Sequence, residues 1–177
     1  MIFNTFGYSI IVMLFNLIYD LSMERNNKII GREYEQKLIK QSFESDNSEL
    51  IAVYGRRRIG KTFLIKNVFN EKFDFCFTGM YETSRSTQLR QFGKELSKYS
   101  KNNYDMPKDW FEAFDKLKDF LLSLNRKKVI VFLDELPCID TQKSNFPSAF
   151  SYFWNIWASE KCIYKTICMR FFNHLDA

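Results

Sequence analysis

Residues 55–62 of this 177-residue sequence have the types and spacing that hold phosphate groups. They read GRRRIGKT and match the pattern GxxxxGK[ST]. Glycines at both ends let the backbone turn so that successive N–H groups point at phosphate oxygens. Lys61 is then expected to reach the β- and γ-phosphates, and the Thr62 hydroxyl is expected to bind Mg²⁺. The segment therefore predicts a loop that binds a nucleotide.

The motif leaves the four positions between the two glycines variable, so the side chains there say less about function than the glycines, the lysine and the threonine do. The three arginines are expected to be solvated or to touch phosphate, and a phenylalanine follows the motif. The ATP-binding residues predicted in this segment are Gly55, Arg56, Arg57, Arg58, Ile59, Gly60, Lys61, Thr62 and Phe63.

A pair of acidic residues, Asp134 and Glu135, directly follows the apolar run VIVFL at 129–133. Such a run is typical of a buried strand, and open α/β sheets bind ligands beyond the carboxyl ends of their strands. Asp134 is expected to hold Mg²⁺ directly or through water, and Glu135 to polarise the attacking water. With Lys61 and Thr62, this predicts an ATPase whose catalytic residues are Glu135 and Lys61 and whose metal ligands are Thr62 and Asp134. The sequence has no NKxD motif, which favours adenine over guanine.

Both groups lie in an alternation of apolar runs and helical patterns. Strands are predicted at 50–54, 73–77 and 129–133, and helices at 32–43, 62–70, 86–98 and 110–124. Strands separated by helix-length segments predict parallel pairing through right-handed crossovers. The predicted fold is α/β, a three-layer P-loop NTPase with a parallel central sheet. Asp109 is predicted to cap the last of these helices, with Glu112 as its capping-box partner.

The composition is that of a folded domain. Apolar residues make up 46% of the chain, and 26 basic and 21 acidic residues give a net charge of +5. This excludes a disordered chain, and so mild a positive surplus does not by itself indicate nucleic-acid binding. The four cysteines lack metal-ligand spacing, which predicts reduced thiols in a cytoplasmic protein.

With both motifs in place, the chain resembles the prokaryotic AAA+ ATPases of the archaeal-type ATPase family, a branch close to the STAND signalling ATPases. The matching segments are IIGREYEQKLI (29–39), ELIAVYGRRRIGKTFLIK (49–66), FTGM with QLRQFGKEL (77–96), and VIVFLDELPCID with KSNFPSAFSYFWNIWAS (129–159).

The resemblance implies several further features. Ile29, Ile30, Gly31 and Arg32 correspond to a box whose backbone and apolar side chains hold adenine. ATP and Mg²⁺ are the implied cofactors, a protein partner or self-association is open, and DNA is implied only by family analogy. For the aromatic stretch at 146–157, core packing is favoured over base stacking.

The resemblance covers 28–159, which is the predicted ATPase domain, and 160–177 is predicted to be a divergent tail. A strand is conceivable at 163–169, but Met169, Arg170 and Phe171 replace the small polar sensor that the resemblance implies. The domain is therefore predicted to be incomplete at its C-terminus, without sensor and lid, so nucleotide binding is expected ahead of hydrolysis. The alternative is a non-catalytic remnant of an ATPase gene.

Residues 1–22 are apolar and carry one charge, Asp20. The uncharged run at 2–19 approaches the roughly 20 residues that span a bilayer. Three interpretations are open: a transmembrane or membrane-surface anchor, an additional element of the core, or a start site assigned upstream of Met23. The first would make the protein a membrane-tethered, nucleotide-dependent regulator held through residues 2–21, instead of a cytoplasmic one.

Overall fold

The computed structural model describes residues 29–56, 58–140 and 144–160, and the backbone of 166–171. The chain divides into two units, 1–32 and 33–177, and each is described by itself. The predicted apolar segment 1–22 and Arg57 lie outside the described residues. Among the residues that are described, no helix has the length and apolar character needed to cross a membrane.

Helices and strands alternate in the second unit, each predicted one lying within about two residues of its observed position. The helices are α2 (Glu33–Glu44), α3 (Lys61–Val68), α4 (Arg85–Ser100), α5 (Trp110–Ser123) and α6 (Phe146–Phe153). The strands are β1 (Leu50–Tyr54), β2 (Phe75–Thr78), β3 (Ile130–Asp134) and β4 (Thr166–Phe171). A 3₁₀ turn, η1 (Leu136–Cys138), follows β3, and a π-helical turn, η2 (Trp154–Ala158), continues α6.

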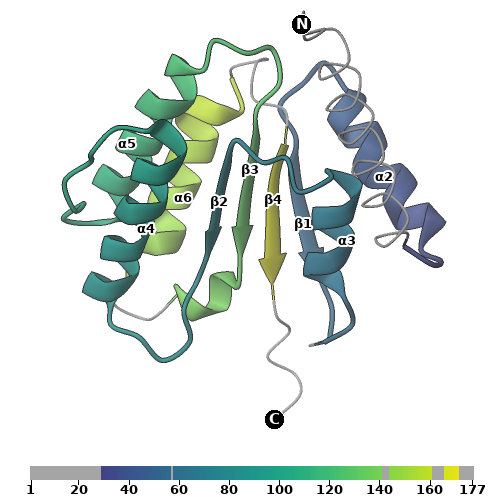
Figure 1. The fold of residues 1–177 in the computed structure, drawn as a ribbon, viewed down its shortest axis with the longest axis horizontal. Helices are drawn as coiled ribbons and strands as arrows, with labels where there is room; N and C mark the ends of the chain where they lie inside the picture. The colour runs from purple at the N-terminus through teal and green to yellow at the C-terminus, as the bar shows by residue number, and fades with distance from the viewer. Residues whose placement is uncertain (1–28, 57, 141–143, 161–165, 172–177) are drawn as a thin grey trace, which may run out of the picture. The chain divides into compact units, whose positions relative to one another are not determined.

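The described strands form one sheet in the order β1-β4-β3-β2, and every neighbouring pair is parallel. Their carboxyl ends therefore lie at the same edge, to which all the arrows point in Figure 1. β4 comes from the segment 160–177, in which a strand at 163–169 is conceivable from the sequence. Its pairing places it between β1 and β3. The sheet confirms the predicted α/β fold with parallel central strands.

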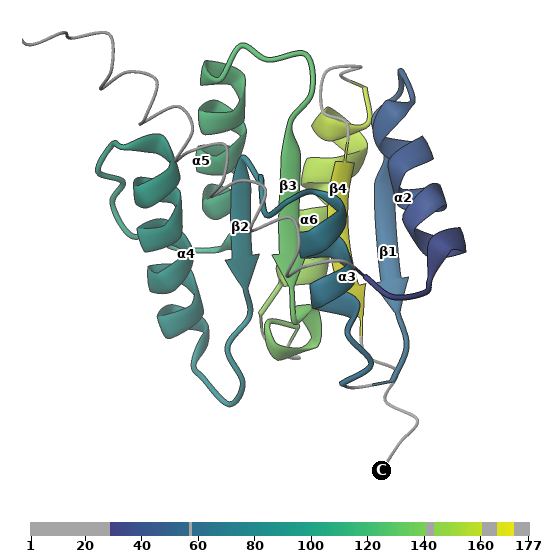
Figure 2. The same ribbon diagram turned by 45° about the vertical axis from the view of Figure 1, so that its right-hand side comes forward.

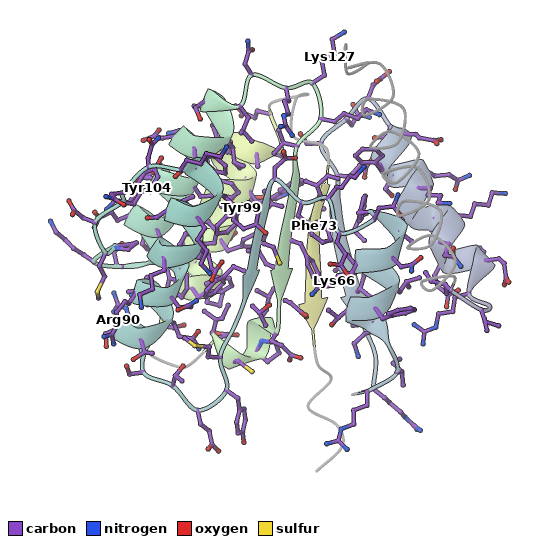
Figure 3. The ribbon with its side chains drawn as sticks, in the orientation of Figure 1. Lys66, Phe73, Arg90, Tyr99, Tyr104 and Lys127 are labelled. Carbon is purple, nitrogen blue, oxygen red and sulfur yellow. The ribbon has the colours of Figure 1, made fainter. Side chains whose placement is uncertain are left out.

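Helices cover both faces of the sheet, which gives three layers (Figures 1 and 2). α4, α5 and α6 lie on one face, and α2 and α3 lie on the other. The side chains of β3 alternate accordingly. Val131 and Leu133 belong to the core on the α4–α6 face, whereas Phe132 stacks on Phe73 at 5.0 Å on the other face (Figure 3).

The core on the α4–α6 face is rich in aromatic rings. Trp110 meets Phe146 edge to face at 4.9 Å, and Phe114 stacks on Phe153 at 5.1 Å. Phe150, in the same helix as Phe146 and Phe153, is also buried. The phenylalanines of α6 thus pack in the interior, as the sequence favours, whereas Tyr152 of the same helix is exposed. The ring contacts of these phenylalanines with Trp110 and Phe114 hold α6 against α5.

The start of α5 differs from the predicted capping box in one contact. Asp109 caps the helix, because its Oδ1 accepts the Glu112 N–H at 2.9 Å. The Glu112 carboxylate accepts the N–H of Lys108 at 2.8 Å, where the capping box would use the N–H of Asp109. The backbone at Asp109 is extended (φ −152°, ψ −179°), as is usual at an N-cap.

Candidate functional site

The predicted phosphate loop connects β1 to α3. Gly55 has φ of 143°, a conformation that side chains rarely adopt, and a Cβ there would lie 3.2 Å from Cδ1 of Ile59. Gly60 has φ of 79° and occupies the N-cap of α3 without a side-chain cap. Arg58 is left-handed as well, with φ of 62°. The loop therefore has the tight, irregular backbone that the glycine spacing predicts.

Lys61, at the start of α3, bonds back to the beginning of this loop. Its side chain is only 4% exposed, and Nζ donates hydrogen bonds to the carbonyl groups of Gly55 and Arg56. An ammonium group is costly to bury unless polar partners surround it. The amine is thus held over the loop by loop carbonyl groups, within the segment where phosphate is predicted to bind.

The two predicted metal ligands are in direct contact, although 72 positions separate them in the sequence. Oγ1 of Thr62 donates a hydrogen bond of 2.9 Å to Oδ2 of Asp134. Asp134 is the last residue of β3 and is buried, and its Oδ1 accepts the N–H of Glu135 at 2.9 Å. Hydroxyl and carboxylate oxygens are ligands that Mg²⁺ prefers, so the donor set fits that ion.

Glu135 begins a sharp turn. Its backbone is left-handed (φ 54°, ψ 42°), and it is the N-cap of η1, in which Pro137 follows. A residue other than glycine adopts this conformation at a cost of about 1–3 kcal/mol, so the surrounding structure must hold it. The turn directs the chain away from β3 directly after the two acidic residues. We call residues 134–138 the acidic turn.

The remaining predicted residues divide into three groups. Arg56, Arg58, Ile59 and Phe63 are exposed around the loop. Arg57 lies outside the described residues. The predicted adenine box, 29–32, belongs to the other unit, where it forms neither helix nor strand and has positive φ at Gly31 and Arg32. The structure thus brings the phosphate loop and the acidic pair together, and the adenine contact stays a prediction.

Two residues beside the acidic turn were not singled out by the sequence. The N–H of Gly79 donates to the carbonyl of Asp134 at 2.9 Å, and Gln88 is buried with its amide bonded to Met80 and Cys138. Both lie in segments that carried the family resemblance, FTGM and QLRQFGKEL. Neither has a side chain typical of catalysis, so residue type gave no signal.

A cavity of about 370 Å³ is lined by residues of β2, the loop after it, and α4. Burial raises the pKa of the Cys76 thiol in its wall to about 11, although nearby Lys66 acts in the opposite direction. At neutral pH this thiol is protonated and is therefore a poor nucleophile. None of the residues predicted to bind the nucleotide lines the cavity. The lining residues are Cys76, Phe77, Thr78, Gly79, Met80, Gln91, Glu95 and Tyr99.

Comparison with known proteins gives relatives in archaea. The chain is 32% identical over 122 residues to the uncharacterized protein MJECL04 of Methanocaldococcus jannaschii, covering 68% of this chain and 25% of that protein. It is 37% identical over 43 residues to the uncharacterized ATP-binding protein MJ0423 of the same organism, covering 24% of this chain and 73% of that protein. The chain thus spans a quarter of the length of the first relative.

Solved structures share the fold at low sequence identity. The Walker-type ATPase Paby2304 of Pyrococcus abyssi has a TM-score of 0.54 and 18% identity, covering 82% of this chain and 46% of that one. A chain of the Drosophila ORC structure bound to DNA has a TM-score of 0.57 and 16% identity, covering 85% and 40%. At these identities the likeness concerns the fold alone.

The family comparison covers most of the chain. Residues 29–169 match the family described as an ATPase domain predominantly from Archaea. The match includes both motifs and extends past residue 159 into β4. The parallel, open α/β sheet is also that of the P-loop ATPase structures above. The chain therefore belongs to the family of ATPase domains found predominantly in Archaea.

Proposed function

We propose that the chain binds ATP with Mg²⁺ through the phosphate loop and the acidic turn. The observation that carries the proposal is the 2.9 Å hydrogen bond between Thr62 and Asp134. It joins the end of the phosphate loop to the end of β3 through two oxygen atoms suited to Mg²⁺. Thr62 and Asp134 would hold the ion, which supplies positive charge against the phosphates.

The loop supplies the rest of the anion site. Backbone N–H groups between Gly55 and Gly60 and the positive end of α3 favour phosphate oxygens. Lys61 would exchange its two loop carbonyl groups for phosphate oxygens, which form stronger, charge-assisted hydrogen bonds. The exposed Arg56 and Arg58 add positive potential at the same place.

The assignment of adenine to residues 29–32 rests on the family. The family match begins at residue 29, so it includes the predicted box. Self-association or a protein partner stays a prediction, and DNA stays an analogy with the family.

Hydrolysis is the second part of the proposal. Glu135 directly follows the metal ligand Asp134, and its carboxylate would accept a proton from the attacking water. Lys61 would stabilise the charge that develops on the transferred phosphoryl group. Binding is the primary activity in this proposal, because it needs only the loop and the acidic turn.

Titration of the full chain with a fluorescent ATP analogue, with and without Mg²⁺, tests the proposal. We expect Lys61→Ala to weaken binding by about 30-fold or more, because it removes a buried cation. Lys94→Ala is the matched control, since Lys94 is an exposed lysine on α4 outside the loop. Equal affinity of the Lys61→Ala variant and the unmodified chain would overturn the proposal.

Thr62→Val separates the role of the metal from that of the loop. Valine keeps the branched shape of threonine and lacks the hydroxyl group that contacts Asp134. We expect the unmodified chain to bind the analogue more tightly with Mg²⁺ than with a chelator, and this difference to shrink at least about tenfold in Thr62→Val. An undiminished Mg²⁺ effect would remove Thr62 from the metal site.

A further inference from the structure

We propose that Gln88 is a positioning residue for Glu135. It acts through the backbone of two segments, the loop after β2 and the acidic turn to which Glu135 belongs. The catalytic part of this inference rests on the proposed function, because only hydrolysis gives Glu135 a chemical role. The structural part rests on the contacts of Gln88 alone.

Gln88 lies one turn into α4 and is 2% exposed. Its side-chain amide makes three hydrogen bonds, all to backbone groups. Nε2 donates to the carbonyl of Met80 at 2.6 Å and to the carbonyl of Cys138 at 3.0 Å, and Oε1 accepts the N–H of Met80 at 3.1 Å. One buried side chain therefore joins the loop after β2 to the turn after β3.

The first connection to Glu135 runs through η1. Cys138, whose carbonyl accepts from Gln88, donates its own N–H to the carbonyl of Glu135 at 2.9 Å. Gln88 thus fixes the far end of the acidic turn, and the turn's own hydrogen bond transmits this to Glu135.

The second connection runs through Gly79. Gln88 holds both the N–H and the carbonyl of Met80, the residue after Gly79. The N–H of Gly79 donates to the carbonyl of Asp134, and a Cβ on Gly79 would lie 2.5 Å from the carbonyl oxygen of Glu135. The backbone of Gly79 therefore packs directly against the peptide group of Glu135.

The two connections meet at Glu135, whose backbone conformation is unfavourable unless neighbouring groups hold it. Glu135 is left-handed, with φ of 54°, and such residues persist only where their surroundings determine them. Removal of the Gln88 amide would leave half-buried backbone groups of Met80 and Cys138 without these partners and would release both loops. The acidic turn would then relax, and the Glu135 carboxylate would shift relative to Asp134 and Thr62.

Gln91 provides a matched control on the same helix. It is half-buried, and its Nε2 donates to Glu95 of the same helix at 2.8 Å. We compare Gln88→Met with Gln91→Met in the full chain, because methionine keeps the length of glutamine and removes the amide. Both substitutions place the same side chain in α4, and only Gln88→Met breaks the link to the acidic turn.

Hydrogen exchange without nucleotide is the first measurement. We expect the N–H groups of Gly79 and Cys138 to exchange at least about tenfold faster in Gln88→Met and at an unchanged rate in Gln91→Met. Exchange rates that are the same in the two variants would overturn the proposal. This readout does not require ATP, so it tests Gln88 even if the chain fails to bind the analogue and the proposed function falls.

Nucleotide measurements separate positioning from a general loss of structure. We expect Gln88→Met to keep its affinity for the ATP analogue within about threefold, while turnover falls by about 10- to 100-fold. A parallel fall in affinity and turnover would overturn the proposal. Gln88→Glu keeps the acceptor for Met80, but it sets a carboxylate oxygen against the carbonyl groups of Met80 and Cys138, so its turnover should fall at least as far as that of Gln88→Met. If Gln88→Met does not fold, Gln88→Asn, whose shorter side chain keeps the amide and cannot span both loops, is compared with Gln91→Asn by the same criteria.

Discussion

The phosphate loop and the acidic turn lie at the same edge of the sheet and are held in different ways. The loop is closed by its neighbour Lys61, whose amine bonds two carbonyl groups at most six positions away. The acidic turn is held by Thr62, Gly79 and Gln88, which are distant from it in the sequence. The conformation of the loop is thus fixed by contacts between residues close in the sequence, and the conformation of the turn by contacts with residues far from it in the sequence. We expect changes in the loop to act mainly on binding, and changes around the turn that leave Asp134 in place to act mainly on turnover.

Glu135→Gln should give the largest separation of binding from turnover. Glutamine keeps the shape of the side chain and cannot accept the proton from water, so turnover should fall about 10²- to 10⁴-fold. Affinity for the ATP analogue should stay within about threefold, because Glu135 lies outside the phosphate loop. Phosphate release and analogue titration measure the two quantities. Asp140→Asn, an exposed acidic residue beyond η1, is the control. A comparable loss of affinity would remove the distinction between the two regions.

Gly79→Ala should destabilise the protein through the acidic turn. The new Cβ would lie 2.5 Å from the carbonyl oxygen of Glu135 and 2.6 Å from Cγ1 of Ile139. A backbone atom cannot move aside cheaply, so we expect a loss of about 1–3 kcal/mol in the free energy of unfolding. Urea denaturation measures it, and turnover should fall in parallel. An unchanged midpoint and turnover would mean that the turn is less tightly packed than its contacts indicate.

Gly60→Ala in the phosphate loop should have a smaller effect on stability. Beyond its immediate neighbours in the chain, no described atom lies within 4 Å of the position of its Cβ, so the substitution causes no clash with another segment. Only the left-handed backbone, with φ of 79°, is unfavourable for alanine, which costs about 1 kcal/mol. The same urea experiment compares the two glycines. A larger loss at Gly60 than at Gly79 would reverse the order that distinguishes loop from turn.

The local character of the loop explains why the sequence predicted it well. Residues 55–62 are consecutive, and their motif determines both the turn of the backbone and the closing lysine. The strands and helices were also predictable, since each follows from the periodicity of a short segment. The sequence also placed Thr62 and Asp134 in one predicted metal site, because the carboxyl ends of parallel strands share one edge, but it gave no signal of the direct hydrogen bond between them.

The supports of the acidic turn could not be predicted in this way. The bonds of Gln88 to Met80 and Cys138 depend on where α4 packs, and no spacing rule relates positions 88 and 138. The position of β4 between β1 and β3 likewise depends on long-range pairing. The sequence allows a strand in this segment but does not indicate where it joins the sheet. At the start of α5 the cap Asp109 is as predicted, and only the N–H that Glu112 accepts differs, being that of Lys108 and not of Asp109.

The smallest expected effect is at the start of α5, in neither of the two regions. The N–H of Lys108 and the ammonium group of Lys116 lower the pKa of Glu112 below its ordinary 4.5. A carboxyl group with a lowered pKa stabilises the fold above its unfolded pKa, and this contribution is lost as pH falls through the folded pKa. Glu112→Gln should therefore be slightly less stable than the unmodified chain at pH 7, and equally stable at a pH below the folded pKa. Urea denaturation across this range measures the difference, with Asp115→Asn on the exposed side of α5 as control. Since Glu112 belongs to neither region, affinity and turnover should not change; if either does, the site extends to α5 and two regions are too few to describe it.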